Sequence, residues 1–281
     1  FAQHKDDWQG ALTPERTALG KVLVDQWGGW IWINFDSNAV PLLEWLNPVP
    51  DMLNPFQLQN MRNRWRKWIV FDCNWKVALE AFNETYHDVP RPSAADMRVF
   101  TWESAAANTP EILVNAAKRL VDELPAGTSA PEVSKHWLET ARADDAKRGV
   151  IWPVVDPADV AKSGTSWQVF PNFQIGHAVN NMLCYAARPY GDDPEKCIFE
   201  AAVYELYPNN EGPDTDWEYV VAEDWPPVLQ QDFANMRAVQ QGMKNVGFRG
   251  VLPNPYMERA ISSLHYNLAK FMGQGAPELL D

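Results

Sequence analysis

The chain has 281 residues, enough to bury a sizeable core in one large domain or in one domain plus a fragment. Its formal net charge of −13 argues against a nucleic-acid or anionic-membrane surface, since either would need clustered lysine and arginine. The acidity favours solubility and docking to a basic partner. The 14 tryptophans suit deep packing and an apolar pocket, although core filling is the common role of tryptophan.

The cysteines and the hydropathy pattern bear on location. Cys73, Cys184 and Cys197 are scattered and lack C-x-x-C spacing, which predicts reduced structural thiols in a cytoplasmic protein. No apolar run approaches the ~20 residues of a membrane span, and no charged-then-apolar leader precedes Phe1. We therefore expect neither a membrane segment nor a signal peptide.

The N-terminal part of the chain predicts a hairpin, a linker and a strand. Two β-rich runs, 20–27 and 30–35, flank the turn Gly28-Gly29 and predict a β-hairpin. Residues 41–54 place apolar side chains between prolines and predict a short helix in an interdomain linker. Residues 61–71 predict a strand that leads directly into a helix.

That helix, predicted from Asn74 through His87, is the most informative segment. Its apolar residues recur at i, i+3, i+4 and i+7 and predict a core-facing stripe. Its other stripe can bind a metal, because it combines carboxylates, an amide and an imidazole. The members of this polar stripe are Glu80, Asn83, Glu84 and His87. On spacing alone, a solvated polar face that ends in a histidine is the favoured alternative.

The remaining elements alternate between helical and extended patterns. Capping signals predict helices over residues 109–124 and 129–148. Three β-rich runs follow, at 166–175, 180–189 and 196–207, and their short turns predict an antiparallel meander. Helices over 228–245 and 256–273 close the chain. A curved antiparallel sheet with helices on one side is an α+β fold.

Residue order adds a family resemblance. Asn74-Trp75-Lys76, then Glu80-x-Phe82, then Glu84-x-Tyr86-His87 resembles the iron-site helix of the Rieske non-haem iron aromatic ring-hydroxylating oxygenases, in their alpha (large) subunit. The resemblance implies that His87 binds a mononuclear Fe(II). It also implies that Glu84 links the iron histidine to a Rieske histidine of the neighbouring subunit.

The resemblance extends to later segments. Residues 167–172 look like the first sheet strand of the family's catalytic domain, and residues 228–236 look like the helix that brings the iron's carboxylate, here Asp232. The alternative for Asp232 is a charge favoured by the helix dipole. The implied fold is the helix-grip (START/Bet v 1-like) antiparallel sheet with covering helices. Pocket candidates are Phe82, Asn83, Phe173 and Met236.

The hairpin resembles the last hairpin of a Rieske domain. This resemblance implies two parts of the chain, the C-terminal remnant of a Rieske domain at 1–40 and a catalytic domain at 41–281. A Rieske [2Fe–2S] cluster needs two cysteines and two histidines, in this family as Cys-x-His and Cys-x-x-His pairs, and no cysteine here has such a neighbour. We therefore expect the chain to begin just after the cluster-binding segment, with the cluster present in the intact protein.

The second iron histidine is also missing from its expected position. The family places it five residues after the first, where this chain has Pro92. His177 is the only substitute we consider, and a satisfied core histidine is the commoner role for such a residue. A loop omitted after Asp88 is the better explanation. If the sequence is complete, the site has lost a ligand.

The resemblance implies an oxygenase that uses O2 and electrons from NAD(P)H, passed through a separate reductase with or without a ferredoxin. Its product would be a cis-dihydrodiol, a monohydroxylated or a dealkylated compound, made from an aromatic or other hydrophobic ring. A homotrimer, with or without beta subunits, is expected, and Trp27, Trp30, Trp32 and Trp45 offer aromatic contact surface unless they fill the local core. The alternative function is a helix-grip protein that binds hydrophobic ligands without chemistry.

Overall fold

The computed structural model describes residues 5–83, 90–92, 99–104, 125, 128, 130–164, 166–255 and 258–275. Within these ranges, no helix is long and apolar enough to cross a membrane. The predicted helix over 109–124 lies outside the described residues.

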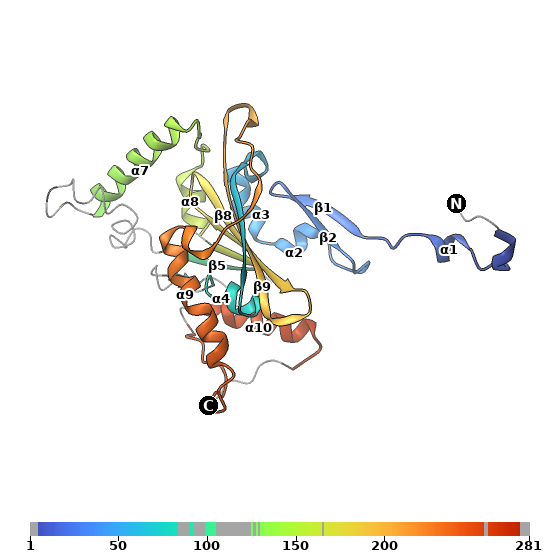
Figure 1. Cartoon of the computed structure of the whole chain (residues 1–281). Coiled ribbons are helices and arrows are strands. Elements are labelled where there is room, and N and C mark those ends of the chain that lie inside the picture. Colours follow the sequence, from blue (N-terminus) through green and yellow to red (C-terminus); the bar gives the residue numbers. More distant parts are fainter. Residues whose placement is uncertain are drawn as a thin grey trace.

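The described strands form a hairpin and a large sheet (Figure 1). The hairpin consists of β1 (Leu23–Trp27) and β2 (Trp30–Asn34). The sheet has the strand order β10-β3-β9-β8-β7-β6-β5-β4. Its strands are β3 (Arg62–Phe71), β4 (Pro90–Pro92), β5 (Val99–Ser104), β6 (Ser166–Val169), β7 (Phe173–His177), β8 (Asn181–Tyr190), β9 (Asp193–Glu205) and β10 (Trp217–Tyr219).

The described α-helices do not all lie against this sheet, since the first of them lies apart from it on the N-terminal extension (Figure 1). They are α1 (Pro14–Thr17), α2 (Leu42–Leu46), α3 (Val49–Leu53), α4 (Trp75–Glu80), α7 (Ala130–Lys147), α8 (Pro157–Lys162), α9 (Pro227–Gly242) and α10 (Arg259–Phe271). The predicted α+β class is confirmed, and so are the hairpin, the strand before α4, and the helices α7, α9 and α10.

Three details differ from the predicted elements. The sheet is mixed, because β10 pairs with β3 in parallel while β5 to β9 pair antiparallel. The run at 166–175 is two strands, since the chain reverses between Val169 and Phe173 to pair β6 with β7. The single linker helix is two short helices, α2 and α3, with Pro48 between them.

The sheet buries side chains on both faces. The helix face, which carries Ile69, Tyr185 and Phe199, packs against α4, α9 and α10. The hairpin face, which carries Ile175 and Met182, packs against β1–β2, α2 and α3. Figure 1 shows α4 and α9 on the opposite side of the sheet from the hairpin. Because strand side chains alternate between faces, neighbouring residues in β7 and β8 belong to different cores.

The tryptophans of the hairpin lie in the local core. Trp27 is buried, and Trp30 and Trp32 pack beside it against the hairpin face. Trp45 contacts the ring of Phe271 at 5.6 Å between centroids. These contacts favour the alternative that the four tryptophans pack in the local core, although Trp30, Trp32 and Trp45 are only half-buried and the subunit contact stays a prediction.

A buried ion network fixes the end of α7 to β9. The Arg148 guanidinium donates to both oxygens of Glu205 at 2.9 and 3.0 Å, and the Tyr207 hydroxyl donates to the same carboxylate at 2.8 Å. Arg148 also pairs with Asp145, which accepts from Asn180 at 2.8 Å. Glu205 is 1% exposed. Charges buried this deeply are tolerated only when paired and hydrogen-bonded.

Replacing Arg148 with Met should lower the free energy of unfolding by about 3 kcal/mol, because it leaves two buried carboxylates without their main cation. The adjacent Lys147→Met variant is the matched control, since Lys147 pairs with Asp144 on the exposed surface and should cost less than about 1 kcal/mol. Urea denaturation measures both. Equal losses in the two variants would contradict a stabilising role for the network.

Candidate active site

Helix α4 is anchored at its start by Asn74. The Asn74 side chain caps the helix by accepting from the Lys76 backbone N–H at 3.1 Å. Its Nδ2 donates to the Pro194 carbonyl at 2.7 Å, and its backbone N–H donates to Gln240 Oε1 at 3.0 Å. These bonds tie α4 to the start of β9 and to α9, so the first turn of α4 is fixed in position.

Helix α4 ends at Glu80, earlier than the sequence pattern predicts. The chain tightens after it, as Phe82 N–H donates to the Leu79 carbonyl at 3.1 Å and Asn83 N–H donates to the Glu80 carbonyl at 2.9 Å. The Phe82 carbonyl accepts from Gln174 Nε2 on β7. The predicted helix therefore does not continue over residues 81–83, and its remaining part, 84–87, cannot be compared. Glu84 and His87 lie outside the described residues.

The side chain of Phe82 is stacked on the helix face of the sheet. Its ring centroid lies 4.5 Å from that of Tyr185 and 5.0 Å from that of Phe199, in both cases nearly parallel. It also meets Phe233 of α9 edge-on at 6.4 Å. Such aromatic pairs stabilise beyond their area burial. The end of α4 and the first half of α9 therefore share one aromatic cluster.

Asp232 lies on α9 beside this cluster. Leu229, Phe233 and Met236 are buried at helical spacing, and the Asp232 side chain between them is half-buried. Burial raises the pKa of Tyr185 well above its usual range, and the charge of Asp232 raises it further. The structure thus brings four of the candidates to the helix face: Phe82, Asn83, Asp232 and Met236.

The carboxylate of Glu80 interacts with His265 on helix α10. Glu80 Oε1 lies 2.6 Å from His265 Nε2 on α10. The Glu80 side chain is largely buried, with 13% of its area exposed. The predicted polar stripe is therefore divided in the structure, since Glu80 connects α4 to α10 while Asn83 is buried after the helix end.

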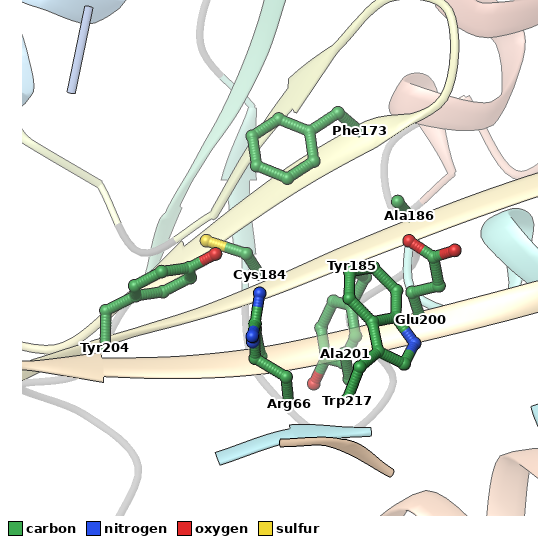
Figure 2. A pocket seen from close by; sticks show the side chains of 10 residues that line it. Arg66, Phe173, Cys184, Tyr185, Ala186, Glu200, Ala201, Tyr204 and Trp217 are labelled. Atoms are coloured by element: carbon green, nitrogen blue, oxygen red, sulfur yellow. The ribbon is translucent and has the colours of Figure 1, made fainter. Parts of the chain in front are cut away.

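Phe173 lies apart from the other candidates. Its ring packs against Trp30 at 5.2 Å and Trp32 at 6.0 Å, which places it on the hairpin face. Figure 2 shows Phe173 there, with Cys184 and Tyr204, lining a cavity of about 110 Å³. This cavity is separated by the sheet from Asp232 and Phe82.

His177 is a core histidine. Its ring lies 4.8 Å from that of Phe56, and its Nε2 donates to the Ser163 carbonyl at 3.2 Å. Burial lowers the pKa of His177, so its ring is neutral near pH 7. Because it lies on the hairpin face with Ile175, two residues before it in β7, it does not replace a ligand beside Asp232.

The described residues do not contain an assembled metal site. Among them, no group of three or more His, Cys, Asp or Glu side chains is arranged to hold a metal ion. Pro92 occupies the position expected for a second histidine. It lies in the edge strand β4, opposite Trp102 of β5. Proline has no side-chain atom that can bind a metal. All three cysteines are buried free thiols, which confirms the prediction of structural thiols.

Three residues of the helix face were not among the sequence-based candidates. Gln168 and Gln174 are 5% and 4% exposed, and Tyr185 is 9% exposed. The sequence does carry a signal for the glutamines, since a polar residue at the core-facing position of a strand is unusual. Which face of β6 and β7 points to α4 is known only from the fold.

Comparison with known proteins defines the family. The family model of the ring hydroxylating alpha subunit (catalytic domain) matches residues 58–274. This match covers more than half of the chain. The chain therefore belongs to the family of ring-hydroxylating oxygenase alpha-subunit catalytic domains, which confirms the resemblance seen in residues 74–87.

Two solved structures of CntA have the same fold as this chain, with TM-scores above 0.5. The quaternary ammonium Rieske monooxygenase CntA in complex with γ-butyrobetaine has a TM-score of 0.58 at 13% identity, covering 96% of this chain and 66% of that chain. Its apo form gives 0.57 at 14% identity, with the same coverage. Naphthalene 1,2-dioxygenase from Rhodococcus sp. bound to indole gives 0.47 at 13% identity, covering 89% and 65%. No curated protein matches. This chain spans just under two thirds of the length of these CntA and naphthalene 1,2-dioxygenase chains.

The neutral state of His177 should make stability depend on pH. With its folded pKa below the unfolded value of about 6.5, the unfolded chain binds a proton that the folded chain does not. Stability should therefore fall as pH drops below about 6.5, by at most ~1.4 kcal/mol per pH unit from this residue. Urea denaturation between pH 7.5 and 5 should show a shallower loss in His177→Gln. Identical slopes in the variant and the wild type would refute this origin.

Proposed function

We propose that this chain is the catalytic part of a Rieske-type oxygenase that hydroxylates an aromatic or other hydrophobic ring compound with O2. In this proposal His87 and Asp232 bind one mononuclear Fe(II). The observation that carries it is the contact of Phe82 with Phe233 at 6.4 Å. Phe233 directly follows Asp232, and Phe82 precedes His87 by five residues, so their contact supports a pairing of these two ligands.

The donor set suits the metal. An imidazole and a carboxylate are two members of the 2-His-1-carboxylate triad of non-haem Fe(II) oxygenases. When bound, the iron supplies the activation of O2. The chain's own side chains provide an aromatic wall, in which Phe82, Tyr185 and Phe199 stack against one another. This wall favours an aromatic substrate, because an apolar aromatic surrounding excludes water.

Electron delivery is the proposed role of Glu84. It precedes His87 by three residues, and a carboxylate there can orient a ligand histidine by hydrogen bonding. Electrons would come from NAD(P)H through a reductase, with or without a ferredoxin, and through the Rieske cluster of a neighbouring subunit. A head-to-tail contact of this kind closes into a ring, which supports a homotrimer. One solved CntA structure is described in terms of inter-subunit electron transfer.

Residues 1–40 are proposed to be the C-terminal part of a Rieske domain, with the catalytic domain at 41–281 in a helix-grip arrangement. The inner side of the hairpin packs on the catalytic core through its tryptophans. Its outer side is apolar and open, since Val24, Ile31 and Ile33 are 63%, 75% and 62% exposed. An apolar surface of this kind fits coverage by a further part of such a domain. The buried free thiols support a cytoplasmic location.

Replacing either His87 or Asp232 with Ala should abolish mononuclear iron binding, because each variant removes a ligand. The secondary structure measured by circular dichroism should stay unchanged. Metal analysis of protein loaded with Fe(II) measures the loss. Asn235→Ala, at an exposed position of the same helix as Asp232, should keep its iron. Full iron in both ligand variants would refute the assignment. Absence of iron from the wild type would favour the alternative of a hydrophobic-ligand-binding protein.

The Glu84→Ala variant should still bind iron, but its turnover should fall on the order of a hundredfold, because the variant removes a residue that orients a metal ligand. Product formation with the natural reductase measures turnover, and iron content of the same sample is the control. Light scattering gives the assembly state. Undiminished turnover, or a monomer in the active preparation, would rule out the inter-subunit role.

A further inference from the structure

The helix face carries a row of buried polar side chains beside the end of α4. In the sheet register Gln168 pairs with Gln174, and Gln174 pairs with Tyr185, so the three lie side by side across β6, β7 and β8. The stacking of Phe82 on Tyr185 shows that this row faces α4. Asn83, at 1% exposure, follows Phe82 directly.

The hydrogen-bonding capacity of these amides is only partly used. Gln174 Nε2 donates to the Phe82 carbonyl and, at 2.7 Å, to Ser166 Oγ. In the described part of the chain, Gln174 Oε1, Gln168 Nε2 and both amide atoms of Asn83 are buried without a hydrogen-bond partner. Each buried unpaired donor or acceptor costs about 1–3 kcal/mol. Such a group of unmet donors and acceptors, beside an aromatic wall, is suited to a ligand.

The chemistry of the amides defines what they can bind. Amides are neutral, so they cannot offset the cost of burying a charged group. Gln168 Nε2 offers a donor and Gln174 Oε1 an acceptor, so the matching group must both accept and donate. Phe82 and Tyr185, which stack on each other next to these amides, give an aromatic body an apolar surrounding.

We propose that Gln168, Gln174 and Asn83 bind an uncharged substituent that both donates and accepts hydrogen bonds, such as a phenolic hydroxyl, on an aromatic substrate. The inference rests on the proposed oxygenase function and narrows its substrate class from hydrophobic rings in general to hydroxylated or similarly substituted rings. A bare hydrocarbon in the same place would leave the amides unpaired, and this is the physical source of the selectivity.

Phenol and toluene test the inference, because they have nearly the same shape and differ in the hydroxyl. Isothermal titration calorimetry of the iron-loaded wild type should give phenol a dissociation constant about tenfold below that of toluene. Gln168→Leu should reduce this preference to less than about threefold, because it removes the free donor. Ile175→Val is the matched control. It changes a buried residue next to Gln174 that belongs to the hairpin-face core, and it should keep the preference.

A second variant, Asn83→Ala, keeps the test decisive if Gln168→Leu fails to fold, and it should also reduce the preference. Equal affinities in the wild type, an undiminished preference in the folded variants, or binding of neither compound would overturn the inference. Iron content of the same samples separates it from the proposed function. A phenol preference in protein that takes up no iron means that the oxygenase proposal fails while the polar site stands. Iron without a preference overturns the polar site alone.

Discussion

The position of Phe82 is the constraint on which the candidate site depends. Its ring is stacked between the sheet and α9, and its carbonyl is bonded to Gln174 on β7. These contacts end α4 and fix the point from which the chain continues toward Glu84 and His87. A free helix of this composition would continue further, because its residues are good helix formers. Burial of one aromatic ring outweighs the loss of a few helical hydrogen bonds.

The sheet is buried on both faces, and this burial explains how the short helix α4 is held in one position. On one face α4, α9 and α10 share an aromatic and aliphatic core, and on the other the hairpin and α2–α3 form a second one. The sheet between them cannot tilt toward either side without opening a cavity. The helix face is therefore a rigid platform. Rigid elements hold functional side chains more accurately than loops do.

Buried polar groups in this protein are of two kinds. The network of Arg148, Asp145 and Glu205 is paired throughout and connects α7 to the sheet. The amides of Gln168, Gln174 and Asn83 are buried to a similar degree and only partly paired. The first kind holds the fold together. The second lowers stability in the absence of a ligand, and proteins keep such costs mainly at functional sites.

The sequence by itself determined the α+β class, the hairpin, the strands β3, β8 and β9 and the closing helices, because period-2 and period-3.6 patterns follow directly from backbone geometry. It also determined the family, through the residue order from Asn74 to His87. Tertiary structure alone decided the end of α4, since the stacking of Phe82 on Tyr185 involves residues about a hundred positions apart in the chain. It also decided which candidates meet: Phe173 and His177 lie on the hairpin face, opposite Asp232. A strand's alternation is visible in its sequence, but the face that receives each helix depends on packing of the whole sheet.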